Sequence, residues 1–370
     1  MEVSLKRILI ILIFIFCNML YGEEMRYGIY VTGSFAGKGK IFNILDELKE
    51  ANITMLVIDL KTISGELTFK FDNSLANDIR SNSYPPIKDI SFLIDTLKKE
   101  GFYLIGRTTV CYDDILSSTR PDLALYIEKN YNFELIPWVN PSCDEVVDYN
   151  LNVIEEAYKL GFDEVQLDYI RYPATKSKLV DFKGDFIEPE KRKFYISSFC
   201  KQASIIAKKY NRKISIDVFG VTAWGRIADI NQIGQHIGLI SHDIKIISPM
   251  LYPSHFYNFY INGKPAENEP ELIIEVGCNK IRAISEHKDI LVRPWLQAFT
   301  YRVPDYGPDY IIKQIFGALN ANVSEVLFWN PVCSYKTVYK ALQILKSFNI
   351  KNDNSLYILE PVSTEATTNG

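Results

Sequence analysis

The sequence lacks the cysteine and histidine patterns that bind metals or build disulfide frameworks. Its six cysteines form no Cys-x-x-Cys pair, and its four histidines form neither an HxH nor an HExxH motif. We therefore expect neither a zinc site nor a disulfide-stapled scaffold. The nucleophile elbow GxSxG, the P-loop and the dinucleotide-binding GxGxxG turn are also missing. Without them the sequence predicts no metal and no cofactor.

An excess of charge of one sign is missing as well. Lys and Arg number 41 and Asp and Glu number 45, so the net charge is −4. This balance gives no electrostatic reason to bind nucleic acid or an anionic membrane, and we expect neither as a partner. Apolar residues make up 47% of the chain and charged residues 23%, which is typical of a globular protein. Aromatic residues are abundant at 13%, which is compatible with a surface that stacks on sugars.

The N-terminus has the order of a secretory signal peptide. Lys6 and Arg7 precede the apolar run Ile8–Leu20, and Gly22 stands before the acidic pair Glu23–Glu24. An apolar run of this length is too short to cross a bilayer comfortably. We therefore predict that residues 1–22 are a signal peptide and that the protein is exported, to the periplasm or out of the cell. A retained N-terminal anchor is the alternative, and it is the only membrane contact that we expect.

Removal of that segment leaves five cysteines, an odd number that cannot pair completely. We expect most of them to be buried free thiols. A bridge from Cys111 to Cys143 is the alternative.

Short apolar runs alternate with helical periodicity along most of the chain. This alternation predicts a single parallel (β/α)8 TIM barrel over residues 26–350, with an open doubly wound sheet as the alternative. The polar tail, residues 352–370, is predicted to be disordered. The predicted strands are Tyr27–Gly33, Thr54–Lys61, Tyr103–Val110, Glu164–Arg171, Lys213–Gly220, Asp243–Tyr252, Ile290–Ala298 and Glu325–Asn330. The predicted helices are Ile41–Ala51, Ile87–Glu100, Asp144–Leu160, Glu190–Tyr210, Ala228–Ile240, Glu271–His287, Tyr310–Leu319 and Tyr335–Phe348.

The loops after the predicted strands are much longer than those before them. In a barrel all of these long loops rise from the C-terminal face, where barrel active sites lie. This asymmetry indicates a functional site at that face. The long loops are Thr62–Pro86, Cys111–Cys143, Tyr172–Pro189 and Pro253–Pro270.

Alternation along the strands points three aspartates into the barrel near its C-terminal mouth. They are Asp59, Asp168 and Asp217, each flanked by apolar residues that face the helices. Each carboxylate on its own has a structural explanation as a loop cap or an arginine partner. Several at one end favour a functional site, because buried charges are costly unless partners compensate them. The other polar or aromatic residues that we place at the mouth are Arg107, Gln166, Arg171, Tyr252, Arg293, Trp295, Gln297, Trp329 and Asn330.

Asp168 and Asp217 lie on neighbouring strands, and paired carboxyl groups suit the cleavage of glycosidic bonds. We expect Asp168 to stay ionised, with Arg107 and Arg171 beside it, and to act as nucleophile or charge stabiliser. Asp217 would be the general acid/base, its pKa raised by burial and by its neighbour. The two residues form the predicted catalytic pair. The spacing does not separate retaining from inverting chemistry.

Four segments resemble a family described as putative glycosyl hydrolases, long catalogued as a domain of unknown function. They are Gly28–Gly33, Val57–Lys61, Trp138–Pro141 and, most specifically, Gly161–Pro173. The resemblance implies a TIM barrel related to glycoside hydrolases and often exported. Barrels of the α-amylase type carry an aspartate after the fourth strand, as Asp168 does here, and a glutamate after the fifth. Asp217 is shorter than that glutamate, so the proton donor stays open and Glu66 is another candidate.

The leading hypothesis is therefore an exported glycoside hydrolase that acts on a polysaccharide or oligosaccharide. Trp295 and Tyr252 would supply stacking platforms, and the remaining mouth residues would bind or orient the substrate. The alternative is a non-catalytic barrel that binds cell-envelope carbohydrate, with its carboxylates too far apart or occupied by arginine. A third hypothesis, a phosphodiester or ester hydrolase, requires metal ligands clustered at the mouth.

Overall fold

The computed structural model describes residues 25–256, 259–261, 263–287, 289–303, 305–349 and 360–361. The predicted signal peptide lies outside these residues, and so does the predicted disordered tail apart from the short strand at 360–361. No described helix is both long enough and apolar enough to span a bilayer.

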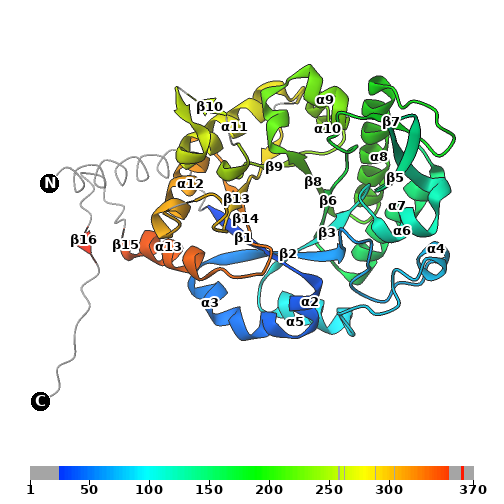
Figure 1. Ribbon diagram of the computed structural model, residues 1–370. Helices are drawn as coiled ribbons and strands as arrows, with labels where there is room; N and C mark the ends of the chain where they lie inside the picture. Colours follow the sequence, from blue (N-terminus) through cyan, green and yellow to red (C-terminus); the bar gives the residue numbers. More distant parts are fainter. Residues whose placement is uncertain are drawn as a thin grey trace, which may run out of the picture.

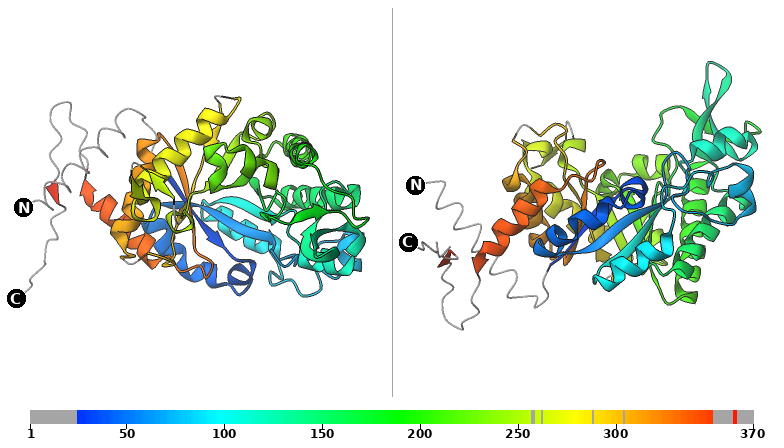
Figure 2. Two further views of the ribbon diagram at one scale, coloured as in Figure 1. Left: turned by 45° about the horizontal axis from the view of Figure 1, so that its top comes forward. Right: turned by 90° about the horizontal axis from the view of Figure 1, so that it is seen from below.

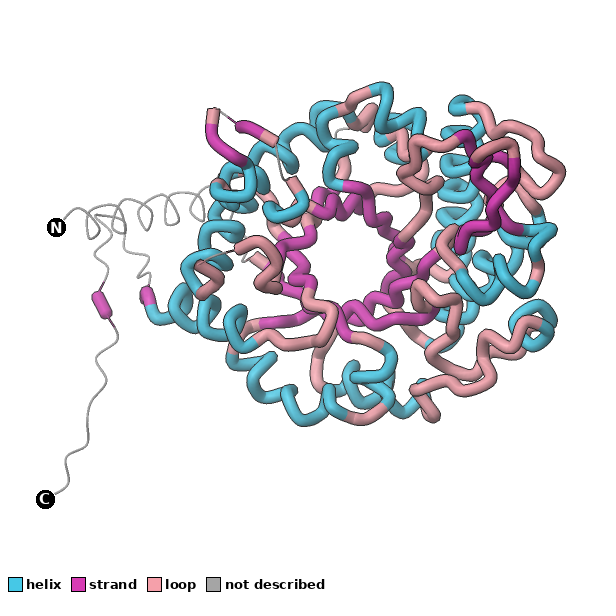
Figure 3. Tube along the Cα trace, in the orientation of Figure 1, coloured by secondary structure: helices cyan, strands magenta, loops and turns pink. Residues whose placement is uncertain are grey.

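Eight parallel strand positions close into a barrel, and helices surround the barrel (Figure 1). Figure 3 looks into the ring of strands and shows the helices outside it. The seventh position is split into β12 and β13, which both pair with the preceding strand β9. The closed parallel sheet confirms the predicted barrel and excludes the open doubly wound alternative. The strands are β1 (Arg26–Val31), β2 (Ile53–Lys61), β3 (Tyr103–Thr109), β6 (Glu164–Asp168), β8 (Lys213–Phe219), β9 (Ile246–Met250), β12 (Leu291–Val292), β13 (Trp295–Gln297) and β14 (Glu325–Trp329).

The helices that cover the barrel match the predicted segments closely, with two exceptions. The expected helix Ile41–Ala51 begins as a 3₁₀ turn and becomes α-helical only from Leu45. The expected helix Ala228–Ile240 is divided in two, because Gly234 ends the first part in a left-handed conformation, with φ of +79°. The α-helices are α2 (Gly33–Gly37), α3 (Leu45–Glu50), α4 (Ser74–Asp78), α5 (Ile90–Lys99), α6 (Asp114–Thr119), α7 (Asp144–Leu160), α8 (Pro189–Lys209), α9 (Ile227–Ile233), α10 (Ile237–Ser241), α11 (Pro270–Ile284), α12 (Pro308–Asn320) and α13 (Lys336–Ser347). Short 3₁₀ turns are η1 (Lys40–Ile44), η2 (Pro121–Leu123), η3 (Gly220–Trp224), η4 (Pro253–His255) and η5 (Ala266–Asn268).

The long loops after the strands carry additional structure that the sequence pattern did not predict. The segment Cys111–Cys143 holds two antiparallel strands, β4 (Ala124–Lys129) and β5 (Asn132–Val139), and β7 (Lys178–Val180) joins them in a small sheet. The β4–β5 hairpin projects from the body of the domain (Figure 2). Two further pairs of short strands are β10 (Tyr260–Ile261) with β11 (Lys264–Pro265), and β15 (Phe348–Asn349) with β16 (Glu360–Pro361).

The apolar core has two parts. The larger cluster lies between the sheet and the surrounding helices. A smaller cluster fills the inside of the barrel, as side chains do in TIM barrels. It contains Tyr30, Met55, Val57, Ile105, Tyr252, Trp295 and Leu327. The barrel is therefore closed below, and only its carboxyl end is free to hold a ligand.

All five described cysteines are free thiols, and four of them are buried. This confirms the expectation of mostly buried free thiols, and the alternative bridge from Cys111 to Cys143 is wrong.

Candidate active site

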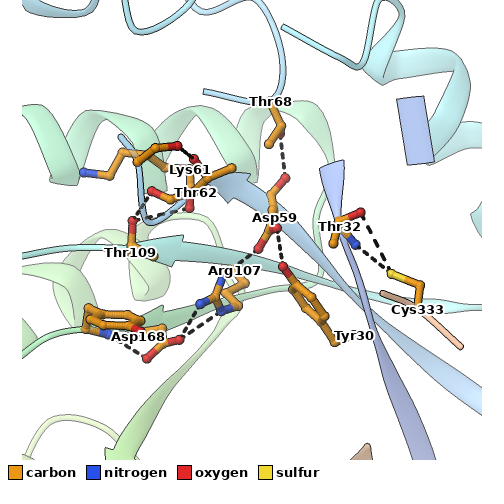
Figure 4. Close-up of polar contacts among 12 residues, drawn as sticks. Tyr30, Thr32, Asp59, Lys61, Thr62, Thr68, Arg107, Thr109, Asp168 and Cys333 are labelled. Carbon is orange, nitrogen blue, oxygen red and sulfur yellow. Dashed lines mark hydrogen bonds and ion pairs between the residues drawn. The ribbon is translucent and has the colours of Figure 1, made fainter. Parts of the chain in front are cut away.

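A chain of buried hydrogen bonds crosses the mouth of the barrel from β1 to β6 (Figure 4). The Tyr30 hydroxyl donates to Asp59 at 2.6 Å, and Arg107 donates to the other oxygen of Asp59 at 2.6 Å. The same guanidinium donates two hydrogen bonds to Oδ2 of Asp168, from Nε at 3.0 Å and from Nη2 at 2.6 Å. Arg107 thus forms ion pairs with two buried carboxyl groups and offsets part of the cost of burying them.

Strand register explains why these residues meet. Asp59 is paired with Arg107 across β2 and β3, and Arg107 with Gln166 across β3 and β6. Between β6 and β8 the pairing runs to Leu167 opposite Ile216. Asp168 and Asp217 are the next residues of these two strands, and both side chains point inward as the alternation predicts.

Asp168 is a carboxylate with both oxygens occupied. Arg107 donates twice to Oδ2, and the Tyr169 backbone N–H donates to Oδ1 at 2.7 Å. Tyr169 has φ of +50°, a conformation that is uncommon for a tyrosine and often marks a functional site. The expected contribution of Arg171 is not seen, because Arg171 forms no ion pair with Asp168. Among the described residues, Arg107 is the cation that forms an ion pair with Asp168.

Asp217 has a different environment. It is 1% exposed, and the Trp295 indole N–H donates to Oδ1 at 2.7 Å. Burial, and then the negative charge of Asp168, raise the pKa of Asp217 well above its usual range. One aspartate is therefore ion-paired with an arginine, and its neighbour favours the protonated form.

A cavity of about 490 Å³ lies over this pair. Asp168, Asp217 and Arg107 form part of its wall. The other residues that line it include Tyr169, Arg171, Phe219, Met250, Tyr252, His255, Trp295, Tyr301, Arg302 and Trp329. The pKa of His255 is lowered by burial and by the positive charge of Arg302, so that imidazole is neutral at neutral pH.

A second cavity of about 370 Å³ adjoins the first on the β1 and β2 side. Arg107, Tyr169 and Trp329 line both cavities. Asp59 and Glu66 belong to the second one, together with Ser34. The two cavities therefore extend to either side of the Arg107–Asp168 pair.

The structure places the predicted site residues in three groups. Asp168, Asp217, Arg107, Arg171, Tyr252, Trp295 and Trp329 line the first cavity, and Asp59 lines the second. Trp295 is only 1% exposed, so it orients Asp217 rather than offering an open face for stacking. Gln166, Gln297 and Asn330 line neither cavity, because their side chains are buried in hydrogen bonds to the protein itself. Arg293 does point inward, but it pairs with Glu164 and Glu325 at the opposite end of the barrel.

Several residues of the site were missed in the sequence. Tyr30 has the same inward parity as Asp59 and ends in the same hydrogen-bond chain, so strand alternation was the signal that pointed to it. Tyr169, Tyr301 and Arg302 lie in irregular segments beyond the strands. No periodic pattern marks such positions.

The described residues contain no group of three or more His, Cys, Asp and Glu side chains that would hold a metal ion. Asp113, an acidic residue of the loop after β3, is fully buried. It caps α6 and pairs with Lys61.

Comparison with known proteins gives one family and many structural relatives. A family model described as a putative glycosyl hydrolase domain matches residues 28–335. No curated protein sequence matches the chain. Among solved structures, the glycoside hydrolase domain of PgaB (BpsB) from Bordetella bronchiseptica is similar over 86% of this chain and 98% of its own. The two chains are 10% identical, with a TM-score of 0.64.

Two other solved structures share the fold. A β-galactosidase from the psychrophilic Marinomonas ef1 is 9% identical, with a TM-score of 0.60, over 87% of this chain and 59% of its own. The spore cortex-lytic enzyme SleL from Bacillus megaterium QM B1551 is 8% identical, with a TM-score of 0.51, over 87% and 74%. At these identities the likeness concerns the fold alone.

Proposed function

The chain belongs to the family described as putative glycosyl hydrolase domain, and from that premise we propose that it is an exported glycoside hydrolase acting on a poly- or oligosaccharide. The observation that carries the proposal is the unequal pair of aspartates at the barrel mouth. Asp168 is ion-paired with Arg107, whereas burial and Asp168 raise the pKa of Asp217. Glycoside hydrolysis uses two carboxyl groups in unlike environments, one of which carries the proton for the leaving oxygen.

In the proposed mechanism Asp217 protonates the leaving glycosidic oxygen. Its Oδ1 accepts the Trp295 N–H, so the proton resides on Oδ2. The ionised Asp168 supports the positive charge that develops on the sugar ring, or attacks the anomeric carbon. Arg107 pairs with Asp168 and is itself held in place by Asp59, which accepts a hydrogen bond from Tyr30.

The two adjoining cavities support a substrate of more than one sugar unit. They share Arg107, Tyr169 and Trp329, so a chain laid across both would place a glycosidic bond near Asp168. Trp329 and Tyr30 stack on each other with ring centroids 4.0 Å apart and stiffen the boundary between the cavities. Export is proposed on the charged, apolar and small-residue order at the N-terminus.

One observation favours a second candidate, a barrel that binds carbohydrate without cleaving it. Both oxygens of Asp168 already accept hydrogen bonds, from Arg107 and from the Tyr169 N–H. A carboxylate held in this way is less free to attack. It retains the charge needed to stabilise an oxocarbenium ion, which is why hydrolysis stays the leading proposal.

A hydrolysis screen over structurally diverse glycans tests the proposal. Release of reducing ends by the wild-type chain, and a loss of about 100-fold or more in Asp168→Asn with the fold intact, would support it. Asp122→Asn is the matched control, because Asp122 is an exposed aspartate that also pairs with an arginine. Unchanged turnover in Asp168→Asn would remove Asp168 from the mechanism. Saturable glycan binding with no product would favour the binding protein.

A further inference from the structure

Arg171 is a buried cation in the wall of the first cavity with no carboxylate partner. It is 8% exposed, and no described carboxylate lies within 4.0 Å of its guanidinium. Its Nη1 donates to the Tyr172 carbonyl at 3.0 Å. No described residue accepts a hydrogen bond from Nε or Nη2. Neither atom is among the fully buried polar atoms that lack a partner, so both have some exposed surface. These donors are therefore available to a ligand in the cavity.

Aromatic rings hold the guanidinium in position. Its central carbon lies 4.5 Å from the ring centroid of Phe219, 4.8 Å from that of Trp138 and 5.3 Å from that of Tyr169. Cation–π contacts of this kind offset part of the cost of burial and fix the plane of the group. Burial nevertheless lowers the pKa of Arg171, so the protein itself does not fully compensate the charge. The other buried arginines of the barrel interior, Arg107 and Arg293, each bind two carboxylates.

The arginines of this wall differ in their pairing. Arg107 is paired with Asp59 and Asp168, whereas Arg171 has no described carboxylate within 4.0 Å of its guanidinium. The chain as a whole carries a net charge of −4. In this acidic protein the guanidinium of Arg171 is thus a local positive charge in the cavity wall, and it attracts an anionic ligand.

We propose that Arg171 is a substrate-recognition residue that binds an oxyanion on the sugar, so that the substrate is an acidic glycan. A planar guanidinium with two outward donors matches the two oxygens of a carboxylate or the edge of a phosphate or sulfate. This inference rests on the proposed function and names the substrate class of the same site. Arg171 touches the substituent of the sugar and takes no part in bond cleavage.

Equilibrium binding in an Asp217→Asn background tests the proposal separately from hydrolysis. Burial and the charge of Asp168 favour the uncharged form of Asp217, so this substitution removes the proposed acid with little change of charge in the cavity. The probes are methyl glucuronide, a sugar phosphate and the neutral methyl glucoside. Intrinsic tryptophan fluorescence reports occupancy, because Trp295 and Trp329 line the cavity and Trp138 packs on Arg171. We expect at least one acidic probe to bind tenfold or more tightly than methyl glucoside. Which of the two binds distinguishes a carboxylate from a phosphate.

Substitutions at Arg171 then assign the preference to this residue. In Arg171→Met the preference for the acidic probe should disappear while the affinity for methyl glucoside stays within about twofold. Arg171→Lys keeps the charge and the stem but lacks the planar fork, and it should retain a reduced preference even if the methionine variant fails to fold. Arg226→Gln, an exposed arginine outside both cavities, should bind like the parent.

Equal affinity for acidic and neutral probes, or a preference that survives in Arg171→Met, would overturn the proposal. A negative glycan screen combined with an Arg171-dependent preference would instead reject hydrolysis and leave the acidic-glycan site standing.

Discussion

Asp217 illustrates how one residue couples acid chemistry to stability. Burial and the charge of Asp168 raise its folded pKa above the value of about 3.9 that an unfolded chain gives. The folded state therefore binds a proton that the unfolded state releases. The contribution of Asp217 to stability is fully present below about pH 4 and is lost as the pH rises toward the folded pKa.

Asp217→Asn should remove this loss of folding stability at higher pH. The amide is uncharged at every pH and still offers an oxygen to the Trp295 N–H, so the variant should be more stable than wild type at neutral pH. The advantage should shrink toward zero near pH 4, and hydrolysis should be abolished. Thermal unfolding measured across this pH range checks the prediction. Parallel Tm curves for the variant and the wild type would contradict it, and Asp168→Asn, which loses an ion pair with Arg107, should be destabilised instead.

Trp295 acts on the proton affinity of Asp217 in the opposite direction to burial. Its indole N–H donates to Asp217 and lowers the pKa of that carboxyl, against the larger effect of burial. Trp295→Phe deletes the donor, so the pKa of Asp217 should rise further. Because the acid must be protonated to act, the alkaline limb of the pH–rate profile should move to higher pH. A limb that moves down or stays in place would show that Asp217 is not the group that titrates.

At the scale of elements, a buried ion pair ties β2 to two helices. Lys61 is fully buried at the end of β2 and donates to Asp113, which caps α6, and to Asn150 on α7. It also lies 4.9 Å from the ring centroid of Tyr149. The pair fixes the loop after β2, which forms part of the second cavity.

Lys61→Met should therefore destabilise the fold by about 3–5 kcal/mol, because it leaves the Asp113 carboxylate buried without its cation. Adding Asp113→Asn should recover part of that loss. Lys49→Met breaks an exposed pair with Glu100 and should cost no more than about 1 kcal/mol. Chemical denaturation of the four proteins measures these differences. Equal losses at Lys61 and Lys49 would mean that burial adds nothing to the pair.

Regular elements are the part of the fold that sequence patterning predicts. The helix Asp144–Leu160 matches α7 at both ends, and Gly161 follows it at φ +109° as a left-handed helix end requires. Alternation along the strands likewise places Asp59, Arg107, Asp168 and Asp217 at the mouth, because parity depends only on neighbouring residues.

The insertions and the exact walls of the cavity depend on tertiary contacts instead. The β4–β5 hairpin has no strict alternation: β5 runs from exposed residues at Asn132 to buried residues at Trp138 and Val139, and β7 pairs with β4 from Tyr126 to Glu128. Gln297 and Asn330 have the expected position at strand ends but turn to bind loop carbonyls. Parity alone does not distinguish a side chain that faces a cavity from one that braces its rim.

For the whole molecule, the two cavities define how far a substrate extends across the barrel mouth. The first is walled by segments after β6, β8, β9 and β13, and the second by segments after β1 and β2. Arg107 and Trp329 stand between them. An oligosaccharide long enough to enter both gains contacts on each side of the bond to be cleaved, and binding energy of this kind is realised in kcat/KM.

We therefore expect kcat/KM to rise with oligosaccharide length until both cavities are filled, and then to level off. Ser34→Trp tests the role of the second cavity, because Ser34 is an exposed residue of α2 that lines it and takes no part in the Arg107–Asp168 network. The indole should occupy the space of a sugar ring and remove most of the gain with length, while the turnover of the shortest cleaved oligosaccharide changes little. A series of defined oligosaccharides with wild type and variant measures both effects. If Ser34→Trp slows all lengths equally, the second cavity is not a substrate site and cleavage is confined to the first.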